Sequence, residues 1–188
     1  VLQENNPALK KFLCTARPAP RWSDPARIIR GQKVFEKYAL PIMTLLGGLS
    51  LPYCYAASPG NKALYLSEKM RQSPGKRLAD TADFILSVCI PGSLEKNQEG
   101  SFAINRTRLI HAIARYHILI KGSWEDRWGM PINKEDMAGT NLAFSYILLL
   151  GLQKSAHILS VSEKEDFLFL WRYIGYQLHI SNQLLPAS

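Results

Sequence analysis

The sequence predicts an all-α fold organised as a single domain. Apolar residues recur at helical spacing along most of the chain, and no stretch shows the sustained alternation typical of a β-strand. Proline, glycine and short polar residues divide the periodic stretches into about seven to nine helices. The chain has 188 residues, of which 47% are hydrophobic and 20% are charged. These values suit one globular domain with a sizeable core.

The first half of the chain alternates short helices with proline-containing breaks. Residues 1–23 are polar and proline-rich and predict an extended arm, followed by a domain over residues 24–188. Asp24-Pro25 offers an N-cap with proline at the first helical position, so we expect a helix to about Tyr38. Shorter segments are expected over residues 41–48 and 53–57, and a helix capped by Ser58-Pro59 over residues 58–70.

The second half carries the stronger helical patterns. Leu78, Ile85 and Cys89 lie on one face of a helix expected over residues 76–90. A central helix follows over residues 101–120 and a third, apolar on nearly all sides, over 133–152 with Asn133 as its cap. The last helix spans 162–178, where Ser162 and Glu165 have the spacing of a capping box.

Charge, cysteine and apolar patterns exclude several classes of function. The net charge of +8 comes from dispersed basic residues, and no helix carries the basic surface run that nucleic-acid binding needs. Three scattered cysteines show no CxxC spacing, which argues against a zinc site or a disulfide framework. The longest apolar runs are too short to span a bilayer, and residues 1–20 contain no signal-peptide core. We therefore expect no transmembrane segment and a cytoplasmic location.

The central helix carries the most informative chemistry. Arg108, His111 and Arg115 are spaced i, i+3 and i+7, so they share one face of a helix whose intervening residues are mostly apolar. Burying three groups that can be cationic is costly unless an anionic partner offsets the cost. The alternative interpretation of His111 is a hydrogen-bonded core histidine. His117, His157 and His179 lie in no pattern typical of ligands.

Two further sets of polar residues have both a functional and a structural interpretation. Arg77 and Thr81 are four residues apart on an otherwise apolar helix face. They either line a polar site or are an exposed arginine and a threonine bonded to its own helix. Glu135 and Asp136 follow a helix cap, and this position favours helix-dipole or ion-pair roles over acid–base catalysis. No hydrolase, P-loop or dinucleotide-binding motif is present.

Three segments, in the same order along the chain as in the family, resemble the MpaB / rubber-oxygenase (latex clearing protein) catalytic-domain family. They are Arg77-Leu-Ala-Asp-Thr81, Arg106-Thr-Arg-Leu-Ile-His111-Ala-Ile-Ala-Arg115, and the stretch from Trp128-Gly-Met-Pro to Phe144-Ser145. Weaker matches include Ile29-Arg-Gly-Gln-Lys-Val-Phe35 and Leu170-Trp-Arg-Tyr-Ile-Gly175. The resemblance covers about residues 20–186. Its specificity comes from the order and spacing of segments that are individually weak.

The resemblance implies an all-α domain around a pocket that holds haem b. Family members use dioxygen to cleave carbon–carbon double bonds in isoprenoid chains. His111 takes the place of the proximal iron ligand, and Arg77 and Thr81 match a catalytic pair near the haem. The spacing of Arg108 and Arg115 about His111 places them at the haem edge, where arginine can hold propionates.

The sequence departs from the rubber enzymes at two places. Asp80 stands where they carry a lysine that can cap the distal iron position, and an acid cannot replace a nitrogen ligand. Their upstream glutamate has no clear counterpart, because Asn61 lies near its expected offset and Glu68 is only a nearby acid. Polyisoprene is therefore not the expected substrate. We expect a haem-b-dependent oxygenase acting on an apolar, alkenyl or isoprenoid-like small molecule, or alternatively a non-enzymatic haem- or lipid-binding module of the same fold.

Overall fold

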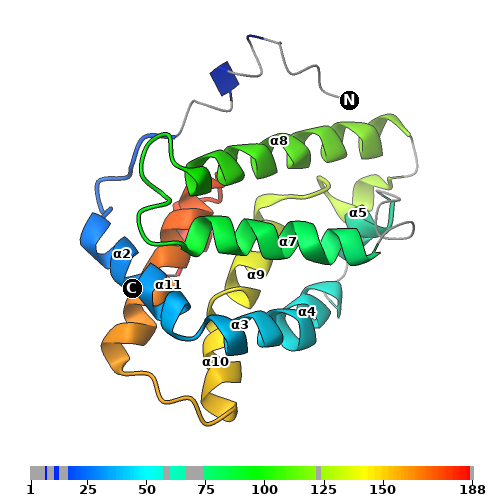
Figure 1. The fold of residues 1–188 in the computed structure, drawn as a ribbon. Helices are drawn as coiled ribbons and strands as arrows, with labels where there is room; N and C mark the ends of the chain where they lie inside the picture. The colour runs from blue at the N-terminus through cyan, green and yellow to red at the C-terminus, as the bar shows by residue number, and fades with distance from the viewer. Residues whose placement is uncertain are drawn as a thin grey trace.

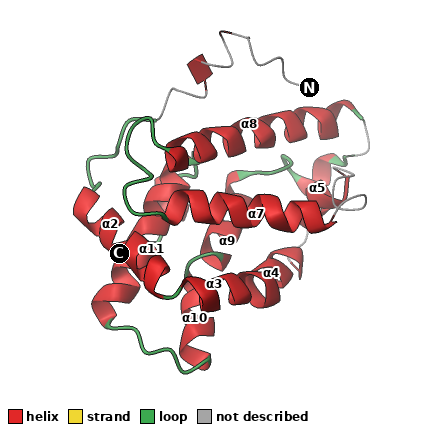
Figure 2. Ribbon diagram, viewed as in Figure 1, coloured by secondary structure: helices red, strands yellow, loops and turns green. Residues whose placement is uncertain are grey.

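The structure is a computed structural model that describes residues 7, 11–12, 17–56, 60–66, 74–121 and 124–186. Within these ranges the regular structure is helical and contains no strand (Figure 2). The all-α prediction is confirmed. Most of the predicted arm over residues 1–23 lies outside the described residues, and residues 17–20 have no regular structure.

The helices follow the chain in an order that Figure 1 traces by colour. They are α2 (Pro25–Lys37), α3 (Ala39–Leu45), the π-helical segment η1 (Leu46–Ser50), α4 (Leu51–Ala56), α5 (Gly60–Leu66), α7 (Pro74–Cys89), α8 (Glu99–Ile120), α9 (Lys134–Ala143), α10 (Tyr146–Lys154) and α11 (Val161–Gln177), with single 3-10 turns at Asp126–Trp128 (η2) and Asn182–Leu184 (η3). The helices predicted over 24–38, 76–90 and 101–120 are confirmed to within two residues. For the helix predicted over 58–70, Ser58-Pro59 and residues 67–70 lie outside the described residues.

The packing of α2 against α11 forms the centre of the core. The carboxylate of Asp24 accepts hydrogen bonds from the backbone nitrogens of Ala26 and Arg27, as an N-cap should. Gly31 faces α11 so closely that a Cβ added to it would lie 2.4 Å from the carbonyl oxygen of Asp166. The buried apolar side chains of α11 fill the space between the other helices: Phe167, Phe169, Leu170, Trp171 and Ile174.

A buried carboxylate fastens these two helices to each other. Asp166 accepts hydrogen bonds from the Nε of Arg27 at 3.0 Å and from the Nε of Arg30 at 2.6 Å. Burial alone would raise the pKa of Asp166, but the hydrogen bonds from Arg30 and Arg27 lower it below its usual value. The ionised form is therefore the one that the fold stabilises.

The prediction of one helix over residues 133–152 is wrong, because the chain turns at Phe144-Ser145 between α9 and α10. Ser145 is fully buried, and its hydroxyl donates to the carbonyl oxygen of Asn141 at 2.8 Å. The turn lets α10 pack against α3 and η1, where Gly151 approaches the side chains of Leu45 and Leu49. No glycine or proline marks the turn, so the local pattern could not predict it.

The predicted capping box of the last helix is displaced by two residues. Ser160 is the N-cap of α11, its hydroxyl accepts from the backbone nitrogen of Glu163, and the Glu163 carboxylate accepts from the Ser160 nitrogen. Ser160 and Glu163 have the same spacing as the predicted pair, Ser162 and Glu165, so the motif alone is ambiguous. Glu163 also pairs with Lys37 of α2, a tertiary contact that favours the earlier start.

One helical stretch, Ala39–Ala56, is long and apolar enough by length and composition to cross a membrane. It comprises α3, η1 and α4, its mean hydropathy is 1.3, and 22% of it is buried. The prediction of no transmembrane segment considered uninterrupted apolar runs and did not identify this stretch. Its inner side, which includes Ile42 and Leu46, packs into the core, as in a core helix of a globular protein.

Candidate functional site

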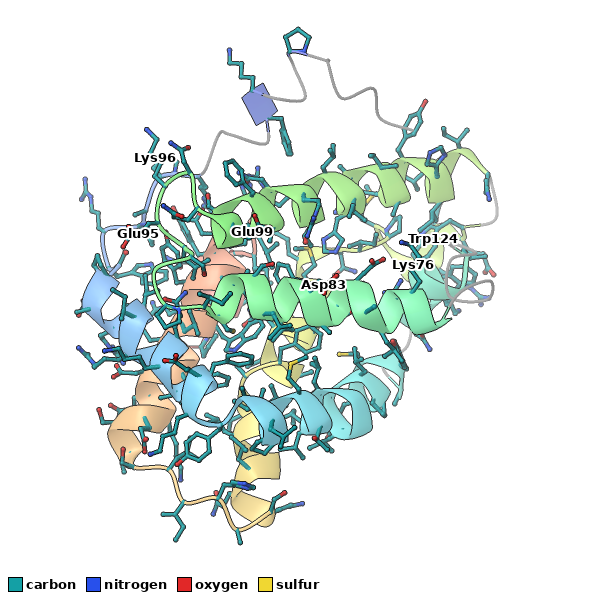
Figure 3. The ribbon with its side chains drawn as sticks, viewed as in Figure 1. Lys76, Asp83, Glu95, Lys96, Glu99 and Trp124 are labelled. Atoms are coloured by element: carbon teal, nitrogen blue, oxygen red, sulfur yellow. The ribbon has the colours of Figure 1, made fainter. Side chains whose placement is uncertain are left out.

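Helices α7 and α8 form an antiparallel pair that carries the predicted site residues. Lys76 and Glu99, labelled in Figure 3, lie toward opposite ends of this pair. At the end where the chain connects the two helices, the pair is closed: Gly100 lies so near α7 that an added Cβ would be 2.8 Å from the carbonyl oxygen of Ser87. The buried amide of Gln32 fixes this connection by donating to the Val88 carbonyl oxygen and accepting from the Gly92 nitrogen.

The opposite half of the pair is less closely packed. Leu78 lies on the same face of α7 as the fully buried Ile85, seven residues later, yet it is 46% exposed. Arg77 and Thr81 on α7, and His111 and Arg115 on α8, are each only partly buried. Side chains between the two helices are therefore more exposed to solvent in the half where the polar residues lie.

His111 is the central residue of this half. Its Nδ1 atom is buried and has no hydrogen-bond partner among the residues that the structure describes. Burial, followed by the positive charges of Arg115 and Arg77, lowers the pKa of His111 to about 4. The imidazole is consequently neutral near pH 7, the form in which histidine binds a metal. His157 also has an unpartnered Nδ1, but its ring packs against Tyr38 rather than beside two arginines.

Arg77 and Thr81 lie one helical turn apart on α7, and Arg77 is near enough to His111 for its charge to lower the pKa of that histidine. The Thr81 hydroxyl donates to the carbonyl oxygen of Arg77 at 2.9 Å, which is the local bond of the structural interpretation. The guanidinium of Arg77 takes part in none of the hydrogen bonds or ion pairs formed among the described residues. Its charge nevertheless acts on His111. The structure thus brings a cation that has no acidic partner among the described residues near a neutral imidazole.

Arg115 holds α8 to the turn that precedes α9. Its Nε donates to the carbonyl oxygen of Pro131 at 3.0 Å, and its Nη2 donates to that of Ile132 at 2.8 Å. Ile132 has a φ of 54°, an uncommon conformation for a β-branched residue. Sequence reasoning missed this pair of acceptors. Pro131 stood out in the sequence only as part of the family resemblance, which says nothing of the direction of its carbonyl group.

Arg108 does not join the group around His111. Its Nη1 donates to the side-chain oxygen of Asn105 at 2.9 Å, and its guanidinium lies 5.2 Å from the ring centroid of Phe12. Burial, and then the charge of Arg17, lowers the pKa of Arg108. Arg17 itself donates to the carbonyl oxygen of Tyr176 at 2.7 Å and stacks on the ring of that tyrosine. Arg108 and Arg115, which were predicted to share one helix face with His111, therefore lie in two different environments.

The acidic candidates have structural positions. The side chain of Asn133 caps α9 by accepting from the backbone nitrogens of Glu135 and Asp136. Burial raises the pKa of Asp136, and the ion pairs among the described residues do not include it. The helix-dipole interpretation thus accounts for both residues without an arginine partner.

Two of the positions at which the chain departs from the rubber enzymes lie among the described residues. Asp80 is exposed on α7. The side-chain nitrogen of Asn61 donates to the carbonyl oxygen of Tyr55, and Glu68 lies outside the described residues. In the part of the chain that the structure describes, no group of three or more histidine, cysteine or acidic side chains could hold a metal ion. A ligand set of several side chains is therefore not evident there.

Comparison with known proteins gives one family. Residues 37–188 match the family described as ER-bound oxygenase mpaB/B'/Rubber oxygenase, catalytic domain. The chain is 24% identical over 186 residues to the rubber oxygenase of Streptomyces sp. (strain K30), a match that covers 96% of this chain and 45% of that protein. The solved structure of latex clearing protein in the closed state superposes with a TM-score of 0.78 at 20% identity, over 100% of this chain and 52% of the other.

The chain thus spans about half the length of the relatives it matches, and the structural likeness shows the shared fold. The family match covers most of the chain and includes α7, α8 and the residues around His111. The chain belongs to the MpaB / rubber-oxygenase catalytic-domain family of oxygenases.

Proposed function

We propose that this protein is a haem-b-dependent oxygenase acting on an apolar, alkenyl or isoprenoid-like small molecule, with His111 as the axial iron ligand. The proposed catalytic domain comprises residues 24–188, with residues 1–23 as an arm. The observation that carries the proposal is the environment of His111: an imidazole kept neutral by burial and by two arginines, with a buried Nδ1 atom that has no hydrogen-bond partner among the described residues.

The residues around His111 fit a haem. A haem held by one axial histidine needs a single protein ligand, so a cluster of metal-binding side chains is not required. An unpartnered buried nitrogen costs free energy, and a ligand that orders the site would offset that cost. The two arginines disfavour protonation of His111 but favour a nearby anion, and haem carries two propionates.

The chain's own residues have distinct proposed roles. His111 would supply a nitrogen ligand to the iron. Arg77, which has no acidic partner in the described part of the chain, is placed to bind a propionate or another anionic group, whereas Arg115 keeps α8 aligned with the turn at Pro131. Leu78, the residue after Arg77, offers exposed apolar surface on α7. When bound, haem would supply the iron that binds dioxygen, while the protein supplies ligation, polarity and placement of the substrate.

An absorption spectrum of protein produced with a haem supply tests the assignment. We expect a Soret band that is lost or strongly shifted in His111→Ala. The matched control is His117→Ala, because His117 is an exposed histidine on the same helix. Absence of a band in the wild-type protein, or an unchanged band in His111→Ala, would contradict the proposal.

The alternative is a haem- or lipid-binding module without oxygenase activity. The exposed Asp80, at a position where the rubber enzymes carry a lysine, favours this alternative. Oxygen uptake by the haem-loaded protein, measured with a panel of isoprenoid alkenes, separates the two functions. Consumption of dioxygen with formation of carbonyl products supports the oxygenase, whereas ligand binding without consumption supports the module.

A further inference from the structure

Four basic side chains from separate parts of the chain meet at the C-terminal end of α11. The carbonyl oxygen of Tyr176 accepts hydrogen bonds from the Nη1 of Arg17 at 2.7 Å and from the backbone nitrogen of His179 at 2.9 Å, so these two residues are neighbours. The charges of Arg108, Arg17 and Lys134 all act on the imidazole of His179. We call Arg17, Arg108, Lys134 and His179 the cationic cluster.

The packing of α9 beside the end of α11 places Lys134 in this cluster. Ile180, the residue after His179, is buried in the same small apolar cluster as Ala138 of α9. Lys134 is exposed and lies one helical turn before Ala138, so the two residues share a face of α9. The members of the cationic cluster therefore come from the segment before α2, from α8, from α9 and from the residues after α11.

The charge of the cationic cluster has no carboxylate partner in the described part of the chain. Burial, and then the positive charges of Arg108, Arg17 and Lys134, lowers the pKa of His179, and no acidic group raises it. Burial and the charge of Arg17 lower the pKa of Arg108 in the same way. Residues 135–136 are acidic and follow Lys134, but the ion pairs of the described residues do not include them. An anion bound to the cluster would offset this repulsion.

The backbone of His179 has a conformation that favours glycine. Its φ is 68°, in the left-handed region, and the residue directly follows Leu178, the C-cap of α11. The backbone nitrogen of Ile180 donates to the carbonyl oxygen of Gly175 at 3.0 Å, which closes the end of the helix. Helices commonly have glycine at this position, because a Cβ there costs free energy. The side chain of His179 is exposed, so packing does not explain the histidine, whereas an anion held by its imidazole would.

We propose that the cationic cluster binds a phosphate group, either free or carried by a small organic molecule. Arg17 and Arg108 each use one Nη1 group in the hydrogen bonds described, and a guanidinium has further N–H donors arranged as a fork. Lys134 adds a point charge, and His179 can donate from both ring nitrogens when it is protonated. A phosphate group matches this set better than a single carboxylate, because it carries more charge and three acceptor oxygens.

Calorimetric titration of the haem-free full chain tests the proposal. We expect saturable binding of pyrophosphate, with an affinity that falls as the salt concentration rises. Lys134→Gln removes one positive charge from an exposed side chain, so the affinity should fall about three- to tenfold. Lys154→Gln is the matched control, because Lys154 is an exposed lysine that precedes the other end of α11.

Two further ligands identify the form of phosphate that the cluster takes. Inorganic phosphate and butyl phosphate present the same charged group, and only the second carries an apolar chain. Tighter binding of butyl phosphate assigns the cluster to an organic phosphate, whereas equal binding assigns it to the free anion.

His179→Gly separates anion binding from a structural role of the histidine. Glycine removes the imidazole and the conformational cost together, so we expect weaker binding of pyrophosphate but an unfolding temperature that is unchanged or raised. In the wild-type protein, the NMR signal of the His179 ring should report a higher pKa when pyrophosphate is added, since a bound anion stabilises the imidazolium. The ring of His117, exposed on α8, should not respond.

Several results would overturn the proposal. They are the absence of saturable pyrophosphate binding, equal losses of affinity in Lys134→Gln and Lys154→Gln, and a His179→Gly variant that is less stable yet binds as tightly as the wild-type protein. Loss of pyrophosphate binding on loading with haem would also overturn it, because the cluster would then belong to the haem site. The other measurements use haem-free protein, so they stand apart from the test of the proposed function.

Discussion

The guanidinium of Arg115 is joined to the backbone of Pro131, with Nε to carbonyl oxygen at 3.0 Å, and a second bond reaches the next carbonyl group. This forked contact ties α8 to a turn 16 residues further along the chain. Arg115 is therefore part of the framework that orients His111, one helical turn away. Its charge also contributes to the low pKa of that histidine.

Replacing Arg115 with lysine should separate the effects of charge and geometry. Arg115→Lys keeps a positive charge near His111 but cannot reproduce two parallel hydrogen bonds, so we expect a loss of about 1–2 kcal/mol in the free energy of unfolding. Urea denaturation monitored by circular dichroism measures this loss. Arg106→Lys, an exposed substitution on the same helix, should change the value little. Equal stability of both variants would show that the forked contact contributes nothing.

The low pKa of His111 predicts a loss of stability in mild acid. The unfolded chain protonates this histidine near pH 6.5, whereas the folded protein resists protonation until about pH 4. Stability is therefore full above pH 6.5, falls as the pH decreases toward 4, and has then lost up to about 3 kcal/mol. Denaturation of the haem-free protein at several pH values should show this slope. His111→Gln should flatten it, whereas His117→Gln should leave it unchanged.

The two serines near the start of α11 should differ in their effect on stability. Ser160→Ala removes the side chain that caps the helix and should cost about 1 kcal/mol. Ser162→Ala lies within the first turn and should change stability by less than about 0.5 kcal/mol. Thermal unfolding of the two variants is a direct comparison. A larger loss of stability in Ser162→Ala than in Ser160→Ala would support the helix start at Ser162 that the sequence predicted.

Two glycines should respond in opposite ways to an added methyl group. In Gly31→Ala the new Cβ meets the backbone of α11 at Asp166, which cannot move without disturbing the core, so we expect a loss of about 2–3 kcal/mol. Gly47→Ala meets no atom within 4 Å and should be neutral or stabilising by up to about 1 kcal/mol. Chemical denaturation of both proteins measures the difference. A tolerated Gly31→Ala would contradict the close approach of α2 and α11.

The sequence predicted those features that depend on neighbours along the chain. Local patterns predicted the Asp24-Pro25 start of α2 and the helices α7 and α8. The family resemblance singled out Arg77, and the structure places its charge where it acts on His111. The turn at Phe144-Ser145 did not, because a buried hydroxyl bond and the docking of α10 on α3 stabilise it. The position of Arg108 was also unpredictable, since Arg17 and Phe12, which lie near it, come from a distant part of the chain.

The contact between Arg27 and Asp166 joins residues that are 139 positions apart. Contacts of such long range are expensive in loop-closure entropy, and proteins rich in them fold more slowly than bundles built from neighbouring helices. The α7–α8 pair is local and can form early, whereas α2 cannot be enclosed until α11 has been synthesised. The apolar side of α2 must therefore stay exposed while most of the chain is being synthesised. This exposure makes α2 a natural site for chaperone binding in the nascent protein.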